Sequence, residues 1–178
     1  SIIKPKGTKI VYGLILGSLM VPATTSVVPL FINITKLGLS GTFYPLWLVI
    51  GANAFFVVLF KQFFDKLPMS IIEAARLDGC NNLQIFFRIV MPLSKPITMV
   101  ISMYAVNAAW SDFLLPYLLL NNTGLETVMV RLFQFRNSPV TDVEVLRAIL
   151  FAMIPPIILF TIFQKQIIQG SSDSGVKG

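Results

Sequence analysis

The chain has 178 residues, of which 55% are hydrophobic and only 12% are charged, and its mean hydropathy is +0.79. This composition excludes an ordinary soluble globular domain and predicts an integral membrane protein. Histidine is absent and Cys80 is the only cysteine, which excludes a disulfide framework, a histidine-based metal site and a His-dependent catalytic triad. We predict no catalytic residue, metal or cofactor. The net charge of +6 does not indicate a nucleic-acid partner, because in a membrane protein the placement of Lys and Arg is more informative than their sum.

A helix needs about 20 mainly apolar residues to cross the bilayer core. The apolar segments predict an all-α, polytopic membrane helix bundle with four spans, at about residues 10–31, 45–60, 96–120 and 146–163. The chain begins at Ser1, and a short basic segment leads into the first span without a cleavage site, so we expect no signal peptide. Residues 1–178 are interpreted as one transmembrane domain that is truncated at its amino terminus.

The first span carries Gly13 and Gly17, four residues apart, followed by Pro22 and Pro29. Small residues at this spacing favour close approach of another helix, whereas prolines favour a hinge or an unwound stretch that lines a cavity. The sequence leaves both interpretations open. The second span contributes Asn53, a polar side chain among apolar and aromatic neighbours.

The most informative segment is the polar stretch of residues 65–92, between the second and third spans. Pro68 is suited to start a helix, the residues after it are mostly good helix formers, and Gly79 stands where a left-handed residue would end the helix. Two short helices joined at this glycine would form a compact protrusion that displays Glu73 and Asp78 to a partner.

The second helix of this protrusion is predicted to be capped by Asn81 or Asn82, and Pro92 and Pro96 are predicted to stop it before the third span. Its apolar face is predicted from the i, i+3, i+4, i+7 spacing of Leu83, Phe86, Phe87 and Val90. The alternative to a docking element is an ordinary amphipathic loop packed on its own protein.

The third span contains Asp112. A carboxylate at membrane depth costs about 2.5 to 3.5 kcal/mol on insertion scales, so it should face a cavity, a partner or the interface. Its polar and aromatic neighbours have the chemistry that holds sugar hydroxyls and apolar sugar faces. The candidates for a substrate path are Asn53, Asn107, Trp110, Ser111 and Asp112. The alternative is that Trp110 belongs to an interfacial aromatic belt and that Asp112 bonds another helix.

The fourth span carries Pro155 and Pro156, which remove two backbone donors and are expected to kink it. The orientation of all four spans follows from their flanking charges. Segments 1–9, 61–95 and 164–178 hold ten Lys and Arg residues, whereas segments 32–44 and 121–144 hold three. The positive-inside rule therefore predicts that the central loop and both ends of the chain are cytoplasmic.

In the central loop, Glu73-Ala74-Ala75 is followed after three residues by Gly79 and after nine more by Ile89, with Met91 and Pro92 close behind. This pattern resembles the EAA loop of the permease subunits of binding-protein-dependent ABC importers. Met91 stands where Leu is usual in that family, and Cys80 where Ala is usual. The residues that the resemblance assigns to coupling with an ATPase are Glu73, Ala74, Ala75, Asp78, Gly79, Phe86, Ile89 and Pro92.

Three further motifs resemble the carbohydrate branch of that family, the maltose and multiple-sugar type permeases. They are Lys36-Leu37-Gly38-Leu39, Trp110-Ser111-Asp112-Phe113 and Gly175-Val176-Lys177-Gly178. The resemblance implies two more amino-terminal spans, and thus six in the intact subunit, in a bacterial or archaeal inner membrane. It also implies a second permease, two ATPase subunits, an extracytoplasmic sugar-binding protein and membrane lipid as partners.

Two other classes of protein fit the sequence less well than this family does. An ion-driven secondary transporter ordinarily shows intramembrane charges and an internal repeat, and this chain offers Asp112 and no detectable repeat. An intramembrane hydrolase would use Ser111 and Asp112, but the sequence has no histidine base and no Gly-x-Ser-x-Gly element. A Gly-x-x-x-x-Gly-Lys-Ser/Thr loop is also absent, so ATP hydrolysis is expected on a separate polypeptide and the chain itself is not expected to be an enzyme.

Overall fold

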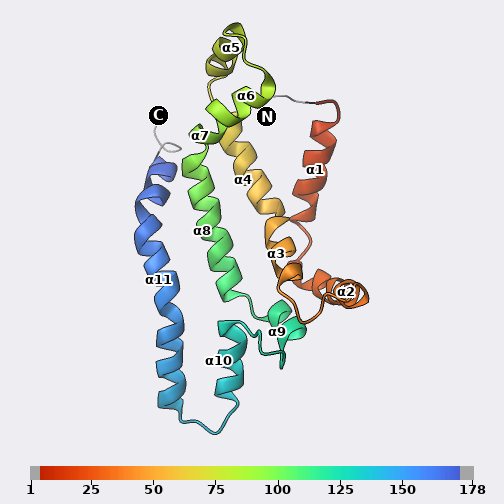
Figure 1. Ribbon diagram of the computed structural model, residues 1–178, viewed down its shortest axis with the longest axis vertical. Helices are drawn as coiled ribbons and strands as arrows, with labels where there is room; N and C mark the ends of the chain where they lie inside the picture. The colour runs from red at the N-terminus through yellow and green to blue at the C-terminus, as the bar shows by residue number, and fades with distance from the viewer. Residues whose placement is uncertain (1–4, 173–178) are drawn as a thin grey trace. The chain divides into compact units, whose positions relative to one another are not determined.

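The computed structural model describes residues 5–172, and every regular element in that range is helical (Figure 1). The predicted all-α class is therefore confirmed. The described residues form two compact units. The first is built mainly from the amino-terminal helix and Ala54–Ser102, and the second from Val21–Asn53 and Met103–Ile162.

The first unit contains α1 (Thr8–Ser18), which packs along α4 (Ala54–Asp65). The Lys61 ammonium lies 4.7 Å from the centre of the Tyr12 ring and pairs with Asp65 one turn further along α4, so one cation joins the two helices. A Cβ on Gly13 or Gly17 would meet no heavy atom within 4 Å among the described residues. The glycines of α1 therefore do not mark a close helix contact within this part of the chain.

The rest of the first unit follows α4. It consists of α5 (Met69–Leu77), α6 (Asn82–Ile85), the π-helical turn η1 (Phe86–Val90), α7 (Met91–Leu93) and the first part of α8 (Lys95–Ser111). The segments from α5 to α7 correspond to the predicted protrusion, and they lie beyond the end of α4 (Figure 1).

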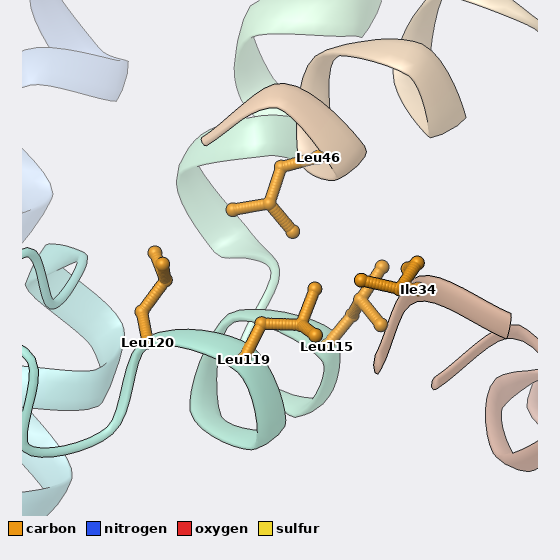
Figure 2. Close-up of a cluster of buried hydrophobic side chains, with 5 residues drawn as sticks. All are labelled: Ile34, Leu46, Leu115, Leu119 and Leu120. Carbon is orange, nitrogen blue, oxygen red and sulfur yellow. The ribbon is translucent and has the colours of Figure 1, made fainter. Parts of the chain in front are cut away.

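The second unit is held together by a cluster of buried leucine and isoleucine side chains (Figure 2). The cluster joins three helices, α2 (Ala23–Lys36), α3 (Tyr44–Gly51) and α9 (Leu114–Leu120). Its buried members are Ile34, Leu46, Leu115, Leu119 and Leu120. The unit is completed by the end of α8, by α10 (Val128–Arg136) and by most of α11 (Asp142–Ser172).

The predicted first span is not one helix. α1 ends at Ser18, and α2 begins at Ala23 directly after Pro22. Pro22 has an extended ψ of 129° and no backbone N–H, so it cannot continue the first helix but can precede the second. The sequence left open close helix packing or a hinge in this segment, and the structure has a break between Ser18 and Ala23.

The predicted third span is wrong at its carboxyl end, because α8 stops at Ser111 and a separate helix α9 starts at Leu114. Pro116 has no N–H to donate to the Asp112 carbonyl. Asp112 and Phe113 separate the two helices, and the backbone N–H groups at the start of α9 lie near the Asp112 carboxylate. The aspartate that the sequence places inside a span thus lies at a helix junction.

Two helices among the described residues are long and apolar enough to cross a membrane, Tyr44–Asp65 and Asp142–Gln164. The number rises to four if each of two bent helix pairs forms one span, namely Thr8–Ser18 with Ala23–Lys36, and Asn82–Leu93 with Lys95–Ser111. Pro155 and Pro156 both lie inside α11, which continues through them.

Candidate functional site

The first helix of the protrusion ends in a Schellman motif centred on Gly79. Gly79 has φ +79°, and its N–H donates to the Arg76 carbonyl, while the Cys80 N–H donates back to the Ala75 carbonyl. These two bonds satisfy carbonyls that the end of α5 would leave open, and glycine takes the left-handed conformation without Cβ strain. The predicted helix end at Gly79 is confirmed.

The second helix of the protrusion starts with a reciprocal capping box. The Asn81 Oδ1 accepts from the Gln84 N–H at 2.9 Å, and the Asn81 N–H donates to the Gln84 Oε1 at 2.8 Å. Both bonds satisfy donors at the start of α6. Of the two predicted caps, Asn81 is the one the structure uses. Only four residues separate the two helices, and the backbone N–H of each of them donates a hydrogen bond.

A small hydrophobic core fixes the two helices against each other. Ile72 and Ala75 from α5 and Ile85 and Val90 from α6 and η1 are buried together. Three partly buried side chains pack against them: Phe64, Cys80 and Ile89. The protrusion therefore has its own core as well as its hydrogen-bonded junction.

The predicted apolar face of the second helix is wrong at Val90. Residues 86–90 form a π-helical turn, closed by the Met91 N–H donating to the Phe86 carbonyl. This i to i+5 pattern brings Ile85 and Val90, five residues apart, into the same buried core. Phe86 and Phe87 instead point away from that core and are exposed, with Phe87 at 58%.

The residues that the resemblance assigns to coupling divide into an exposed and a packed set. Ala75 is buried and Ile89 packs against the core, so these two position the protrusion. The exposed members are Glu73, Ala74, Asp78, Gly79, Phe86 and Pro92. Sequence reasoning missed Leu77, which at 89% is the most exposed apolar side chain of the protrusion, whereas Leu83, at 69%, belongs to the predicted apolar face.

The protrusion joins α8 at a bend of 68°. Pro92 and Pro96 were predicted to stop the second helix, and the continuous helical segment Asn82–Leu93 ends one residue after Pro92. The break falls at the buried Ser94, whose hydroxyl donates to the Met91 carbonyl at 2.8 Å. A one-residue junction with a satisfied hydroxyl links the protrusion directly to the helix that follows.

The candidates for a substrate path lie at three separate features. Asn53 lies between α3 and α4, and Asp112 lies at the junction of α8 and α9. Asn107 and Ser111 are exposed and four residues apart on α8, so they share a face of that helix. Tyr104 is also exposed and lies one turn before Asn107 on the same face, so Tyr104, Asn107 and Ser111 form a polar stripe on α8. The spacing of three residues between Tyr104 and Asn107 was the signal that sequence reasoning missed.

Trp110 has a specific structural partner. Its Nε1–H donates to the Ala152 carbonyl of α11 at 3.1 Å. In a regular helix that carbonyl would accept from residue 156, but Pro156 has no N–H. The tryptophan of the Trp-Ser-Asp-Phe motif therefore satisfies a carbonyl that a proline in another helix leaves free.

The Lys-Leu-Gly-Leu motif after the first span forms a second Schellman motif. The Gly38 N–H donates to the Thr35 carbonyl and the Leu39 N–H donates to the Ile34 carbonyl. Gly38 has φ +68°, and Leu39 packs on the buried leucine cluster with Ile34. The motif thus ends α2 and anchors it, as Gly79 does for α5. The terminal Gly175–Gly178 motif lies outside the described residues.

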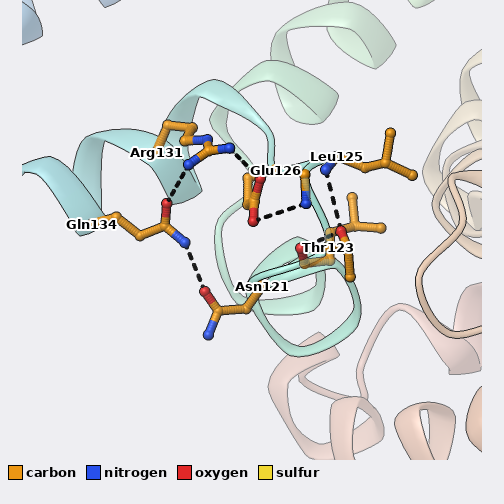
Figure 3. Close-up of polar contacts among 8 residues, drawn as sticks. Asn121, Thr123, Leu125, Glu126, Arg131 and Gln134 are labelled. Carbon is orange, nitrogen blue, oxygen red and sulfur yellow. Dashed lines mark hydrogen bonds and ion pairs between the residues drawn. The ribbon is translucent and has the colours of Figure 1, made fainter.

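Polar side chains surround the loop between α9 and α10 (Figure 3). The Glu126 Oε2 lies 2.8 Å from the Arg131 Nη2, and Gln134 accepts from Arg131 while donating to Asn121. Hydrogen bonds from the backbone N–H groups of Glu126 itself and of Gly124, together with the Arg131 charge, lower the pKa of the Glu126 carboxyl against the opposing effect of burial. Among the described residues, no group of three or more His, Cys, Asp or Glu side chains is placed to hold a metal ion.

Comparison with known proteins identifies relatives over nearly all of this helical framework. Residues 3–172 match the model of the family described as binding-protein-dependent transport system inner membrane component. The chain is 35% identical to the probable ABC transporter permease protein YurM of Bacillus subtilis (strain 168), covering 97% of this chain and 59% of that protein. It is 33% identical to the melibiose/raffinose/stachyose import permease protein MelC of the same organism, covering 97% and 64%.

Solved structures give a consistent result. A chain in the crystal structure of a bacterial ABC transporter involved in the import of the acidic polysaccharide alginate superposes with a TM-score of 0.79 at 25% sequence identity, covering 92% of this chain and 63% of that one. The chain thus spans less than two thirds of the length of the relatives named here. The agreement of sequence, helical fold and matched residues shows that the chain belongs to the binding-protein-dependent transport system inner membrane component family.

Proposed function

We propose that the chain is part of the permease subunit of an ATP-driven ABC importer for a sugar or oligosaccharide. In a bacterial or archaeal inner membrane it would assemble with a second permease, two cytoplasmic ATPase subunits and an extracytoplasmic sugar-binding protein. The carbohydrate class is supported by the names of its relatives, which include import permeases for melibiose, raffinose and stachyose and for arabinooligosaccharides.

The observation that carries the proposal is the construction of the protrusion of residues 65–92. Closure of an ATPase dimer must be transmitted to membrane helices, and a body that keeps its shape transmits displacement better than a flexible loop. The Schellman motif, the capping box and the buried core of Ile72, Ile85 and Val90 supply that rigidity. Its orientation toward the cytoplasm, like that of the carboxyl terminus, is proposed from the Lys and Arg distribution.

The exposed surface of the protrusion has the composition of a docking site. Leu77 and Leu83 are exposed apolar side chains on a polar segment, and burying such side chains in a partner is favourable by about 25 cal/mol per Å². Glu73 and Asp78 are exposed beside them and can form charge-assisted hydrogen bonds with an ATPase cleft. Apolar anchors with a polar rim are the usual anatomy of a protein interface.

The polar stripe of Tyr104, Asn107 and Ser111 is proposed to face the substrate path. It presents hydroxyl and amide groups from one face of α8, which suits exchange of hydrogen bonds with a passing sugar. Asp112 is proposed to act indirectly, by stabilising the start of α9. On this basis Asn107→Leu should lower sugar uptake without loss of assembly, whereas Asp112→Ala should also lower the yield of folded permease.

Co-purification tests the coupling proposal. Full-length permease is purified from detergent with its ATPase, comparing wild type with Leu77→Ser and Glu73→Lys. Leu37→Ser is the matched control, because Leu37 also precedes a Schellman glycine and is 72% exposed, but lies in a segment predicted to be extracytoplasmic. Loss of ATPase in the first two variants alone is expected. Equal recovery from all variants would refute docking at the protrusion, and no ATPase with wild type would refute the importer itself.

A further inference from the structure

The second unit contains an open cavity of about 820 Å³, lined by residues of α10 and α11 and by Trp110 of α8. Most of its walls are apolar. Along α11 they are formed by Ala148, Phe151, Ala152 and Pro155, which recur at i, i+3, i+4 and i+7 and so form one continuous stripe. Because α11 rises about 1.5 Å per residue, this stripe is about 10 Å long. It lies on a helix apolar enough to cross a membrane.

One region of the cavity wall is charged. The Glu126 side chain lines the cavity and is only 2% exposed. Its Oε2 forms an ion pair with the Arg131 Nη2 at 2.8 Å, and no described residue offers this oxygen a further hydrogen bond. A buried carboxylate oxygen with unused acceptor capacity is costly unless a ligand supplies a donor.

Arg131 provides the complementary half of this charged region. Its side chain also lines the cavity and remains 61% exposed, and one of its nitrogen atoms donates to the Gln134 Oε1 at 3.2 Å. Guanidinium groups present several donors and match the geometry of phosphate oxygens. The site therefore offers one acceptor for a cationic donor and, beside it, donors for an anion.

We propose that this cavity binds one phospholipid whose head group carries a primary ammonium, as in phosphatidylethanolamine. The ammonium donates to the Glu126 Oε2, the phosphate accepts from Arg131, and an acyl chain lies along the apolar stripe of α11. Because Glu126 offsets the charge of Arg131, a zwitterionic head group fits the site better than an anionic one. A sugar fits less well, since its hydroxyl groups would face Ala148, Phe151 and Pro155 without partners.

Phosphatidylcholine is the discriminating probe, because its quaternary ammonium has the same charge but no N–H. The assembled importer, with full-length permease, is delipidated in detergent. The amounts of phosphatidylethanolamine, phosphatidylcholine and phosphatidylglycerol that stay bound are then compared by native mass spectrometry. Wild type is expected to prefer phosphatidylethanolamine over phosphatidylcholine by about tenfold or more, the effect of one charge-assisted hydrogen bond. Equal retention of these two lipids would overturn the proposal.

Three variants locate the binding. Glu126→Gln should abolish the preference for phosphatidylethanolamine, whereas Glu144→Gln, which changes an exposed carboxylate outside the cavity, should leave it unchanged. Ala148→Leu places a larger apolar side chain in the cavity and should reduce retention of every phospholipid without removing a charge. Persistence of the preference in Glu126→Gln, undiminished retention in Ala148→Leu, or displacement of the lipid by the transported sugar would each refute the assignment.

Discussion

The hydrogen bond from Trp110 to Ala152 gives a prediction that the structure specifies closely. Pro156 leaves the Ala152 carbonyl without its helical donor, and the Trp110 Nε1–H at 3.1 Å replaces it. Trp110→Phe keeps an aromatic ring but removes the N–H. We expect this change to lower the free energy of unfolding, because a carbonyl between two helices loses its partner.

The magnitude follows from the cost of an unsatisfied carbonyl. A net hydrogen bond contributes about 0.5 to 1.5 kcal/mol, and interhelical bonds within a membrane fall in a similar range. Pro156→Ala restores a backbone N–H one turn beyond Ala152, so the carbonyl no longer depends on Trp110. We therefore expect Trp110→Phe to cost about 1 kcal/mol more in the wild-type background than in the Pro156→Ala background, with the lost ring area cancelling between the two.

The assay is a double-mutant cycle on the full-length permease, unfolded reversibly from bicelles with a denaturing detergent and followed by circular dichroism. Trp47→Phe, at a ring that is 63% exposed in α3, controls for the loss of a tryptophan as such. Equal costs of Trp110→Phe in the two backgrounds would refute the view that this tryptophan compensates for Pro156.

Three further outcomes are expected. Gly79→Ala and Gly38→Ala should each cost about 1 kcal/mol or more of stability, because both glycines have positive φ and open space around them. Only Gly79→Ala should also weaken the stimulation of the ATPase by substrate. An equal loss of ATPase stimulation in Gly38→Ala would contradict the coupling role. Asn81→Ala removes the capping box at a cost of about 1 kcal/mol, so hydrogen exchange should accelerate in residues 82–85; unchanged exchange would show that the cap is not limiting. The pKa of the Glu126 carboxyl is lowered from 4.5 in the folded protein. Its contribution to stability is therefore complete above pH 4.5 and is lost as pH falls through the lowered pKa. The thermal midpoint of Glu126→Gln should be less sensitive to acid than that of wild type, and thermal midpoints that change in parallel with pH would contradict this.

Local sequence signals predicted the protrusion well because its ends depend on single residues. A glycine that can adopt positive φ and an asparagine that can accept from the helix start determine where α5 ends and α6 begins. Gly79 and Asn81 occupy those positions in the structure. The departure of Val90 from the apolar face of the second helix was not predicted, because the i+3, i+4 rule assumes an α-helix and residues 86–90 form a π-helical turn.

For the candidate substrate path, in contrast to the protrusion, local sequence signals did not predict the contacts of the residues. The sequence singled out Trp110 and Asp112 as polar groups at membrane depth, but it could not show what each of them bonds. The structure gives Trp110 a hydrogen-bond partner 42 positions away and places Asp112 beside the backbone N–H groups at the start of α9. A lone polar residue within an apolar segment has many possible partners, and only the fold selects one.

The sequence by itself determined the class of protein, the helical fold and the existence of the central protrusion, because composition, apolar runs and capping residues act over short distances along the chain. The tertiary structure decided where the first and third apolar segments break, which side chains of the protrusion remain exposed, and how Glu126 and Arg131 come to line one cavity with α11. These features depend on contacts between residues far apart in the sequence, and no local pattern records which of those contacts will form.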